Sequence, residues 1–124
     1  MAGNKKVLIV DDEPDILKAA VFRIKKAGYD VIEAVSGKEG LEKAQTEPPD
    51  LIMLDWKLPE MDGVEVYLIL KKTDRLKDIP VVFFTASKEN VDLREKMEEV
   101  GAEHVIIKPY EAEELLSKIK ELIG

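Results

Sequence analysis

The sequence contains no cysteine, and its charge is weighted to the negative side. Without cysteine, neither a disulfide framework nor a thiolate metal site can form. The 19 lysines and arginines are outnumbered by 26 aspartates and glutamates, which leaves a formal net charge of −7. Because nucleic-acid binding draws on clustered basic side chains, this balance argues against a nucleic-acid partner.

Long apolar runs are also missing. No run approaches the roughly 20 residues that a membrane span requires, so we expect no membrane association. Residues 1–6 lead directly into an apolar run without a secretory leader, and we therefore expect a soluble cytoplasmic protein. The chain of 124 residues has the length of one domain, which we place at 1–124, and its 45% hydrophobic residues are enough to fill a core.

Five short apolar runs alternate with five helical patterns. Each run is too short for a helix and has the continuous apolar character of a strand buried on both faces. Strands linked by helices predict an α/β fold, in which helices cover both faces of a parallel sheet and the crossovers are right-handed. We expect the flavodoxin-like (βα)5 doubly wound arrangement, with strand order 2-1-3-4-5. The predicted strands cover residues 7–10, 31–35, 51–54, 80–85 and 104–108.

Helix signals follow each strand. An acid and Pro14 begin the first helix, Ser36 and Glu39 form a capping box for the second, and Gly37 and Gly40 weaken that second helix. In the helix after Gly63, the spacing predicts inward-facing side chains at Val64, Tyr67, Leu68 and Leu70.

Polar side chains lie at the carboxyl ends of four of the predicted strands. Asp11 and Asp12 follow the first strand and Asp55 follows the third. In the order 2-1-3-4-5 these two strands are neighbours, and ligands of open α/β sheets bind outside the carboxyl ends of the strands. Three adjacent carboxylates repel one another unless one is protonated or a cation neutralises them. An all-oxygen site favours Mg²⁺, Mn²⁺ or Ca²⁺, whereas the alternative is that Asp11 and Asp12 only cap the following helix.

Asp55 is the candidate nucleophile, because carboxylates can attack phosphorus to form an aspartyl phosphate. Lys108 offers a point charge and Thr85 a hydroxyl donor, both suited to phosphoryl oxygens. Taken alone, a strand-end threonine more often bonds to backbone, and a lysine is more often solvated. Their position at the ends of adjacent predicted strands favours a role in the site.

Two neighbouring residues leave alternatives open. Trp56 directly follows the candidate nucleophile, and strand alternation points it away from Asp55, either over the rim of a pocket or into ordinary packing. The bond between Lys108 and Pro109 is trans by default, since only about 5–6% of X-Pro bonds in folded proteins are cis.

In this pattern the chain resembles the receiver domain of a two-component response regulator, over nearly all of its length from Lys5 to Ile123. Five elements carry the resemblance in order, and together they are specific although no single one is. They are Asp11-Asp12, Asp55, the loop Leu-Pro-Glu-Met-Asp-Gly at 58–63, Thr85-Ala86 and Lys108-Pro109.

The resemblance implies a metal site and a phosphoacceptor. Asp55 is the implied phosphoacceptor, and Asp12 and Asp55 the direct ligands of Mg²⁺, with Mn²⁺ as a possible substitute. Asp11 assists, often through water, and the backbone carbonyl of Lys57 is a further implied ligand.

The resemblance also implies how the phosphoryl group is held and read. Thr85 and Lys108 contact phosphoryl oxygens, Thr85-Ala86 begins the switch segment, and the family suggests a cis bond before Pro109. Signalling in the family couples the threonine to an aromatic residue three positions before the lysine. That position is Val105 here, which puts the aromatic version of the switch in doubt.

The implied donors are a sensor histidine kinase, a phosphotransfer protein or a small phosphodonor such as acetyl phosphate. The domain is expected to catalyse only its own phosphorylation and dephosphorylation, and to switch a surface formed by the fourth helix, fifth strand and fifth helix. The kinase, the output protein, the pathway and the oligomeric state do not follow from the sequence, nor does the presence of an output domain.

Three alternative functions fit the sequence less well. A phosphatase of the haloacid dehalogenase type places a second aspartate two residues after the nucleophile, where this chain has Lys57, and the chain has no room for a cap domain. A flavin- or nucleotide-binding protein needs a phosphate cradle, but the acidic residues 11–13 repel phosphate, and neither G-x-G-x-x-G nor a P-loop is present. An unphosphorylated scaffold on the same fold is disfavoured by the intact set of site residues.

Overall fold

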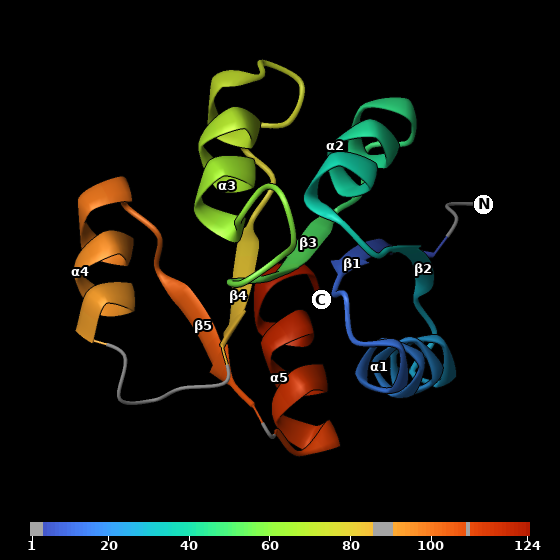
Figure 1. The fold of residues 1–124 in the computed structure, drawn as a ribbon. Coiled ribbons are helices and arrows are strands. Elements are labelled where there is room, and N and C mark those ends of the chain that lie inside the picture. The colour runs from blue at the N-terminus through green and yellow to red at the C-terminus, as the bar shows by residue number, and fades with distance from the viewer. Residues whose placement is uncertain (1–3, 86–90, 109) are drawn as a thin grey trace.

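The computed structural model describes residues 4–85, 91–108 and 110–124. Within these residues, five strands and five helices alternate along the chain, as the apolar runs predict (Figure 1). The strands are β1 (Lys6–Val10), β2 (Asp30–Ala34), β3 (Leu51–Asp55), β4 (Val81–Thr85) and β5 (His104–Ile107). The helices are α1 (Pro14–Lys26), α2 (Gly37–Thr46), α3 (Gly63–Lys72), α4 (Val91–Val100) and α5 (Ala112–Ile123).

All strand pairs are parallel, and the sheet has the order β2-β1-β3-β4-β5, which confirms the predicted topology. Since β1 and β3 are parallel neighbours, the residues that follow Val10 and Leu54 lie side by side at the carboxyl end of the sheet. Since β4 and β5 are parallel neighbours, Thr85 pairs with Ile107 at the same carboxyl end of the sheet. The topology therefore brings four separate segments of the chain to one end of the sheet.

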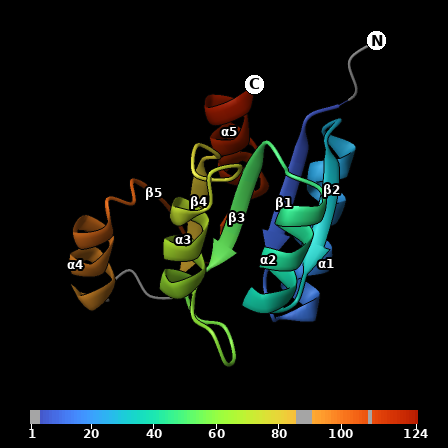
Figure 2. The ribbon, with the colours of Figure 1, turned by 90° about the horizontal axis from the view of Figure 1, so that it is seen from above.

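The sheet separates two hydrophobic cores, because successive strand residues point to opposite faces. Leu54 and Phe83 belong to the core under α2, α3 and α4, whereas Met53 and Phe84 belong to the core under α1 and α5. Figure 2 shows the helices on the two sides of the sheet. Among the described residues, none of the helices has the length and apolar character of a membrane span.

The face of α3 differs from the predicted one. Val64, Tyr67 and Leu70 are buried as expected, but Val66 is also buried and Leu68 is 38% exposed. Helix α3 begins with Gly63 close to the end of β3, and the buried stripe of the helix includes residues 63, 66, 67 and 70. The prediction for Leu68 was therefore wrong.

The glycines of α2 have a packing role that their low helix propensity conceals. A Cβ on Gly37 would lie 2.7 Å from Val66 Cγ2, and one on Gly40 would lie 2.8 Å from Val10 Cγ2. Both residues are buried, and Ser36 caps the helix through a hydrogen bond from the Glu39 N–H, as the capping box predicts. The glycines thus let α2 approach α3 and β1 closely.

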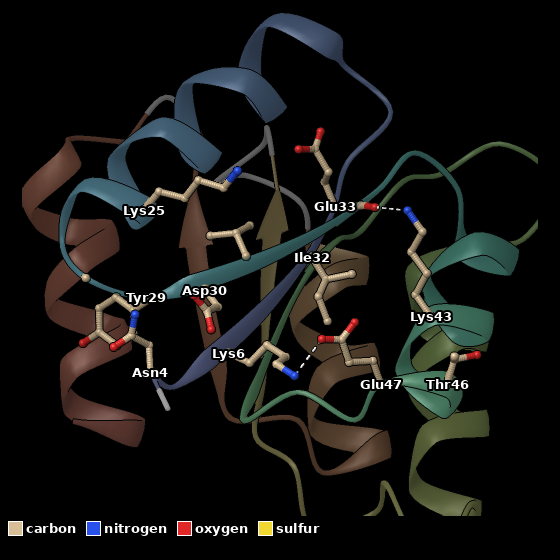
Figure 3. Close-up of a pocket in the computed structure, with 12 residues that line it drawn as sticks. Asn4, Lys6, Lys25, Tyr29, Asp30, Ile32, Glu33, Lys43, Thr46 and Glu47 are labelled. Carbon is tan, nitrogen blue, oxygen red and sulfur yellow. Dashed lines mark hydrogen bonds and ion pairs between the residues drawn. The ribbon is translucent and has the colours of Figure 1, made fainter. Parts of the chain in front are cut away.

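Strand β2 forms one edge of the sheet, and charged side chains gather around it (Figure 3). The Asp30 N–H bonds toward β1, so strand alternation turns the carbonyl of Glu33 to the free side. Lys43 Nζ donates to that carbonyl at 2.6 Å, and the Val35 N–H donates to Glu39 Oε1 at 2.7 Å. The free side of this strand is therefore partly occupied by side chains of α2.

Candidate functional site

Backbone hydrogen bonds continue past the ends of the strands and hold the site residues in place. The Asp11 N–H donates to Ala34 O at 3.1 Å, and the Lys108 N–H donates to Thr85 O at 2.6 Å. Asp55 is itself the last residue of β3. Asp55 thus stands on the sheet, and hydrogen bonds to the sheet hold Asp11 and Lys108 one residue past the ends of β1 and β5.

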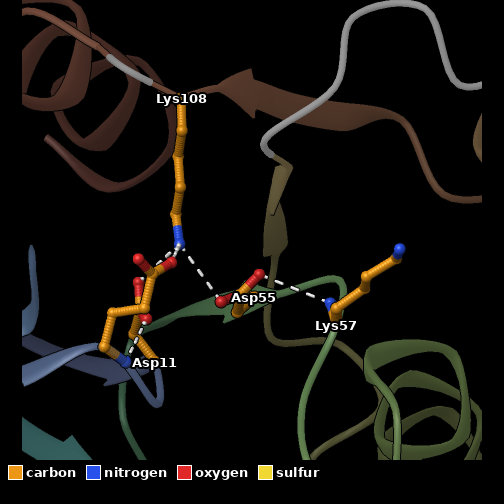
Figure 4. Close-up of polar contacts among 5 residues, drawn as sticks. Asp11, Asp55, Lys57 and Lys108 are labelled. Atoms are coloured by element: carbon orange, nitrogen blue, oxygen red, sulfur yellow. Dashed lines mark hydrogen bonds and ion pairs between the residues drawn. The ribbon is translucent and has the colours of Figure 1, made fainter.

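Lys108 is the centre of the site. Its Nζ lies 2.9 Å from Asp11 Oδ2, 3.1 Å from Asp55 Oδ2 and 3.2 Å from Glu13 Oε1. Figure 4 shows the lysine side chain extended from the end of β5 toward the ends of β1 and β3. One ammonium group therefore pairs with carboxylates from two other strand ends.

Most of this ion-pair network is buried. The side chain of Asp11 is fully buried, and those of Asp55 and Lys108 are only 8% and 7% exposed. Asp12 is exposed, and the side chain of Glu13 is 54% exposed. The site therefore has a buried floor and an open acidic rim.

The buried charges shift one another's protonation. Burial raises the pKa of Asp55 from 3.8 to about 6, although Lys108 opposes the shift. Burial lowers the pKa of Lys108, but the hydrogen bond to Asp11 and the charges of Asp55 and Asp11 outweigh it, so the pKa is raised overall. Lys108 therefore keeps its positive charge, whereas the negative charge of Asp55 is disfavoured by burial in the folded protein.

Four carboxylates could share a metal ion. Asp11, Asp12, Glu13 and Asp55 each offer an oxygen, and these oxygens all lie within 4.8 Å of one another. Oxygen ligands suit Mg²⁺, which commonly takes one or two carboxylates and completes its shell with water and phosphate oxygens. The residues present thus fit a Mg²⁺ ion, and Mn²⁺ is compatible with the same ligands.

The chain after Asp55 folds back over the end of β3. The Lys57 N–H points to Asp55 Oδ1 at 3.4 Å, and the Gly63 N–H donates to Trp56 O at 2.9 Å. A Cβ on Gly63 would lie 2.6 Å from Asp55 O, so only glycine fits here. Between these points Glu60 adopts a positive φ of 67°, which lets the loop reverse.

Several predicted residues have a defined place. Thr85 is buried at the end of β4, and Val105 is half-buried against the core that contains Leu54 and Phe83. Trp56 packs edge-on against Phe83, with ring centroids 5.2 Å apart, so the ordinary-packing alternative describes it. The predictions for Ala86 and Pro109, including the cis bond, concern residues outside the described part of the chain.

Glu13 is the residue that the sequence interpretation missed. The sequence predicts an acid that caps α1, and Glu13 does occupy the N-cap position, but its side chain makes no cap hydrogen bond. The carboxylate instead reaches Lys108, 95 positions away in the sequence. The available signal was that glutamate is not among the preferred N-cap residues, whereas aspartate is.

Comparison with known proteins finds response regulators among the relatives of this chain. The family model of the response regulator receiver domain matches residues 7–120. The alkaline phosphatase synthesis transcriptional regulatory protein PhoP of Bacillus subtilis is 39% identical over 120 residues, which are 97% of this chain and 49% of that protein. The phosphate regulon transcriptional regulatory protein PhoB of Pseudomonas aeruginosa is 36% identical over 97% of this chain and 52% of its own length.

Solved structures agree with these relatives. The chemotaxis protein CheY4 of Vibrio cholerae superposes with a TM-score of 0.90 at 30% identity, covering 98% of this chain and all of that one. This chain spans about half the length of the curated relatives that it matches, but the whole length of this structural neighbour.

Proposed function

This chain belongs to the response regulator receiver domain family of two-component signalling, and on that basis we propose that Asp55 accepts a phosphoryl group and thereby switches a partner-binding surface. The family implies interaction with a histidine kinase or a phosphotransfer protein. The single observation that carries the proposal is the buried Asp55 carboxylate, held at a strand end beside Lys108 and the acidic rim.

The proposed reaction is a direct displacement. An oxygen of Asp55 attacks the phosphorus of a phosphohistidine or an acyl phosphate, and an O–P bond forms while the bond from phosphorus to the donor breaks. The leaving group departs with the electron pair of that bond. Catalysis of this step depends on positioning and on neutralising charge, rather than on covalent help from the protein.

The residues around Asp55 have separate tasks in this proposal. Receiver domains generally bind Mg²⁺, and in this chain Asp11, Asp12, Asp55 and the carbonyl of Lys57 are the proposed ligands. Mg²⁺ bound there supplies positive charge to the oxygens of the transferred group. Lys108 pairs with one phosphoryl oxygen.

Reading the phosphoryl group requires a switch. We place the Thr85 hydroxyl on a phosphoryl oxygen, assign Ala86 to the switch segment and assign Pro109 to the geometry of the site. Val105 has no aromatic ring to move, so in this proposal the movement of Thr85 toward the phosphoryl group starts the signal. The output is a separate protein or a linked domain, because the chain corresponds to about half of its transcriptional relatives.

The test is the intact mass of the protein after incubation with acetyl phosphate and Mg²⁺. We expect one added phosphoryl group in the wild type, and none in Asp55→Ala or after EDTA treatment. Asp74→Ala is the matched control, since Asp74 is an exposed aspartate in the turn after α3 and its loss leaves phosphorylation unchanged. Phosphorylation that persists in Asp55→Ala would refute the proposed site.

A further inference from the structure

The ammonium group of Lys108 has three N–H donors, and each of them has a carboxylate acceptor. The acceptors are Asp11 Oδ2, Asp55 Oδ2 and Glu13 Oε1. An oxygen of a phosphoryl group on Asp55 therefore competes with these acceptors for the N–H donors of Lys108.

Burial decides which acceptor leaves. Asp11 is fully buried, and removing its cation would leave a charge in the protein interior without a partner. Asp55 is the residue that carries the phosphoryl group. The Glu13 side chain is 54% exposed and its contact is the longest of the three, so it can turn into water at little cost.

The backbone of Glu13 does not depend on this contact. Its N–H donates to Asp11 Oδ1 at 2.9 Å, and its carbonyl accepts from the Leu17 N–H at 2.9 Å. Because the side chain makes no cap hydrogen bond, it can move or be shortened while the start of α1 stays in place.

We propose that Glu13 is a positioning residue that occupies the third donor of Lys108 before phosphorylation and releases it to the phosphoryl oxygen. The inference rests on the proposed function of Asp55. Glu13 competes with the phosphoryl group for Lys108, and it therefore weakens the hold of the unmodified site on a phosphoryl group.

The experiment measures binding of beryllofluoride, a mimic of the phosphoryl group on aspartate, in the presence of saturating Mg²⁺. Glu13→Gln removes the competing charge at nearly constant size, and we expect about threefold tighter binding, the size of an exposed ion pair. Acetyl phosphate is expected to phosphorylate this variant faster by a similar factor. Trp56 fluorescence supplies the readout, because the indole follows Asp55 directly in the chain.

The matched control is Asp15→Asn, which removes the same charge from an exposed position in the first turn of α1. A titration with Mg²⁺ alone is the second readout. Support for the inference is tighter beryllofluoride binding in Glu13→Gln than in Asp15→Asn, with Mg²⁺ affinity equal in the two variants.

Three results overturn the inference. They are equal beryllofluoride binding in Glu13→Gln and wild type, an equal gain in Asp15→Asn, and a selective loss of Mg²⁺ affinity in Glu13→Gln, which would make Glu13 a metal ligand. In each case wild-type protein still takes up the mimic. If the wild type takes up neither beryllofluoride nor a phosphoryl group, the proposed function fails first and the inference falls with it.

Discussion

At the scale of single residues, Asp55 is the group whose charge costs the fold most clearly. Its pKa is raised from 3.8 to about 6 because burial disfavours the carboxylate. The folded state therefore binds more protons than the unfolded chain between these two values, so stability falls as the pH rises through this window. Below about pH 4 the penalty is absent, and above about pH 6 it is fully developed.

We expect Asp55→Asn to raise the free energy of unfolding by about 2 kcal/mol at pH 8 and to leave it nearly unchanged at pH 4. Urea unfolding in EDTA across this pH range is the measurement. Asp74→Asn, at an exposed position in the turn after α3, is the control for a loss of charge. A variant that is less stable at pH 8, or equally stabilised at both pH values, would contradict the assignment.

Asp12 lies on the exposed rim of the acidic site, and its proposed role is tested by metal-dependent stability. A ligand that binds only the folded state stabilises it by about 2.7 kcal/mol at one hundred times its dissociation constant. We expect Mg²⁺ to raise the melting temperature of the wild type, EDTA to reverse the effect, and Asp12→Asn to remove most of it. Asp15→Asn should keep the response, and equal responses in the two variants would rule out Asp12 as a ligand.

At the scale of the elements, the contact between α3 and the end of β3 depends on one glycine. Gly63→Ala places a Cβ 2.6 Å from Asp55 O and 3.1 Å from Trp56 Cα, both of which are backbone atoms that cannot turn aside. We expect a loss of about 2 kcal/mol in urea unfolding, together with slower phosphorylation of Asp55.

Gly28→Ala is the matched control for this substitution. Gly28 has a positive φ of 102°, and a Cβ added there would meet no atom within 4 Å, so the cost is backbone strain alone. That strain is about 1 kcal/mol, and we expect loss of stability without slower phosphorylation. If Gly63→Ala behaves in the same way, the close approach does not position Asp55.

The elements themselves were predictable, because continuous apolar strands and helix-start signals are local properties of the sequence. Which face of each helix is buried was harder to predict. The spacing of α3 allowed either Leu68 or Val66 to face the sheet, and the orientation with Val66 buried is the one in which Gly63 packs on the end of β3. That contact joins two elements, and no periodicity within one helix can report it.

At the scale of the whole molecule, the sheet divides the interior into two cores that share strands but not side chains. Ile52 belongs to the core under α2, α3 and α4, and Ile24 to the core under α1 and α5. We expect Ile24→Val and Ile52→Val each to cost about 1 kcal/mol, and the double variant to cost the sum within about 0.5 kcal/mol.

Ile24→Val combined with Ile119→Val is the control pair, because both residues lie in the same core. Denaturant unfolding of the single and double variants gives the coupling free energy of each pair. A larger coupling across the sheet than within one core would show that the two cores do not act independently.

The site also shows what topology can and cannot predict. Strand order alone places Asp11 beside Asp55, and brings Thr85 and Lys108 to the same edge of the sheet. The reach of the Lys108 side chain to Glu13 depends on side-chain directions across 95 positions of sequence. Such a contact is decided by burial and by competition among charges, which residue spacing does not encode.

The side chains on the free side of β2 bear on a different property, the resistance of the protein to aggregation. An exposed strand edge is a template to which a strand of another molecule can add. Lys43 donates a hydrogen bond to the Glu33 carbonyl, and Glu39 accepts one from the Val35 N–H. An incoming strand would have to displace both side chains. Helix α2 therefore hinders the addition of another strand along the β2 edge of the sheet.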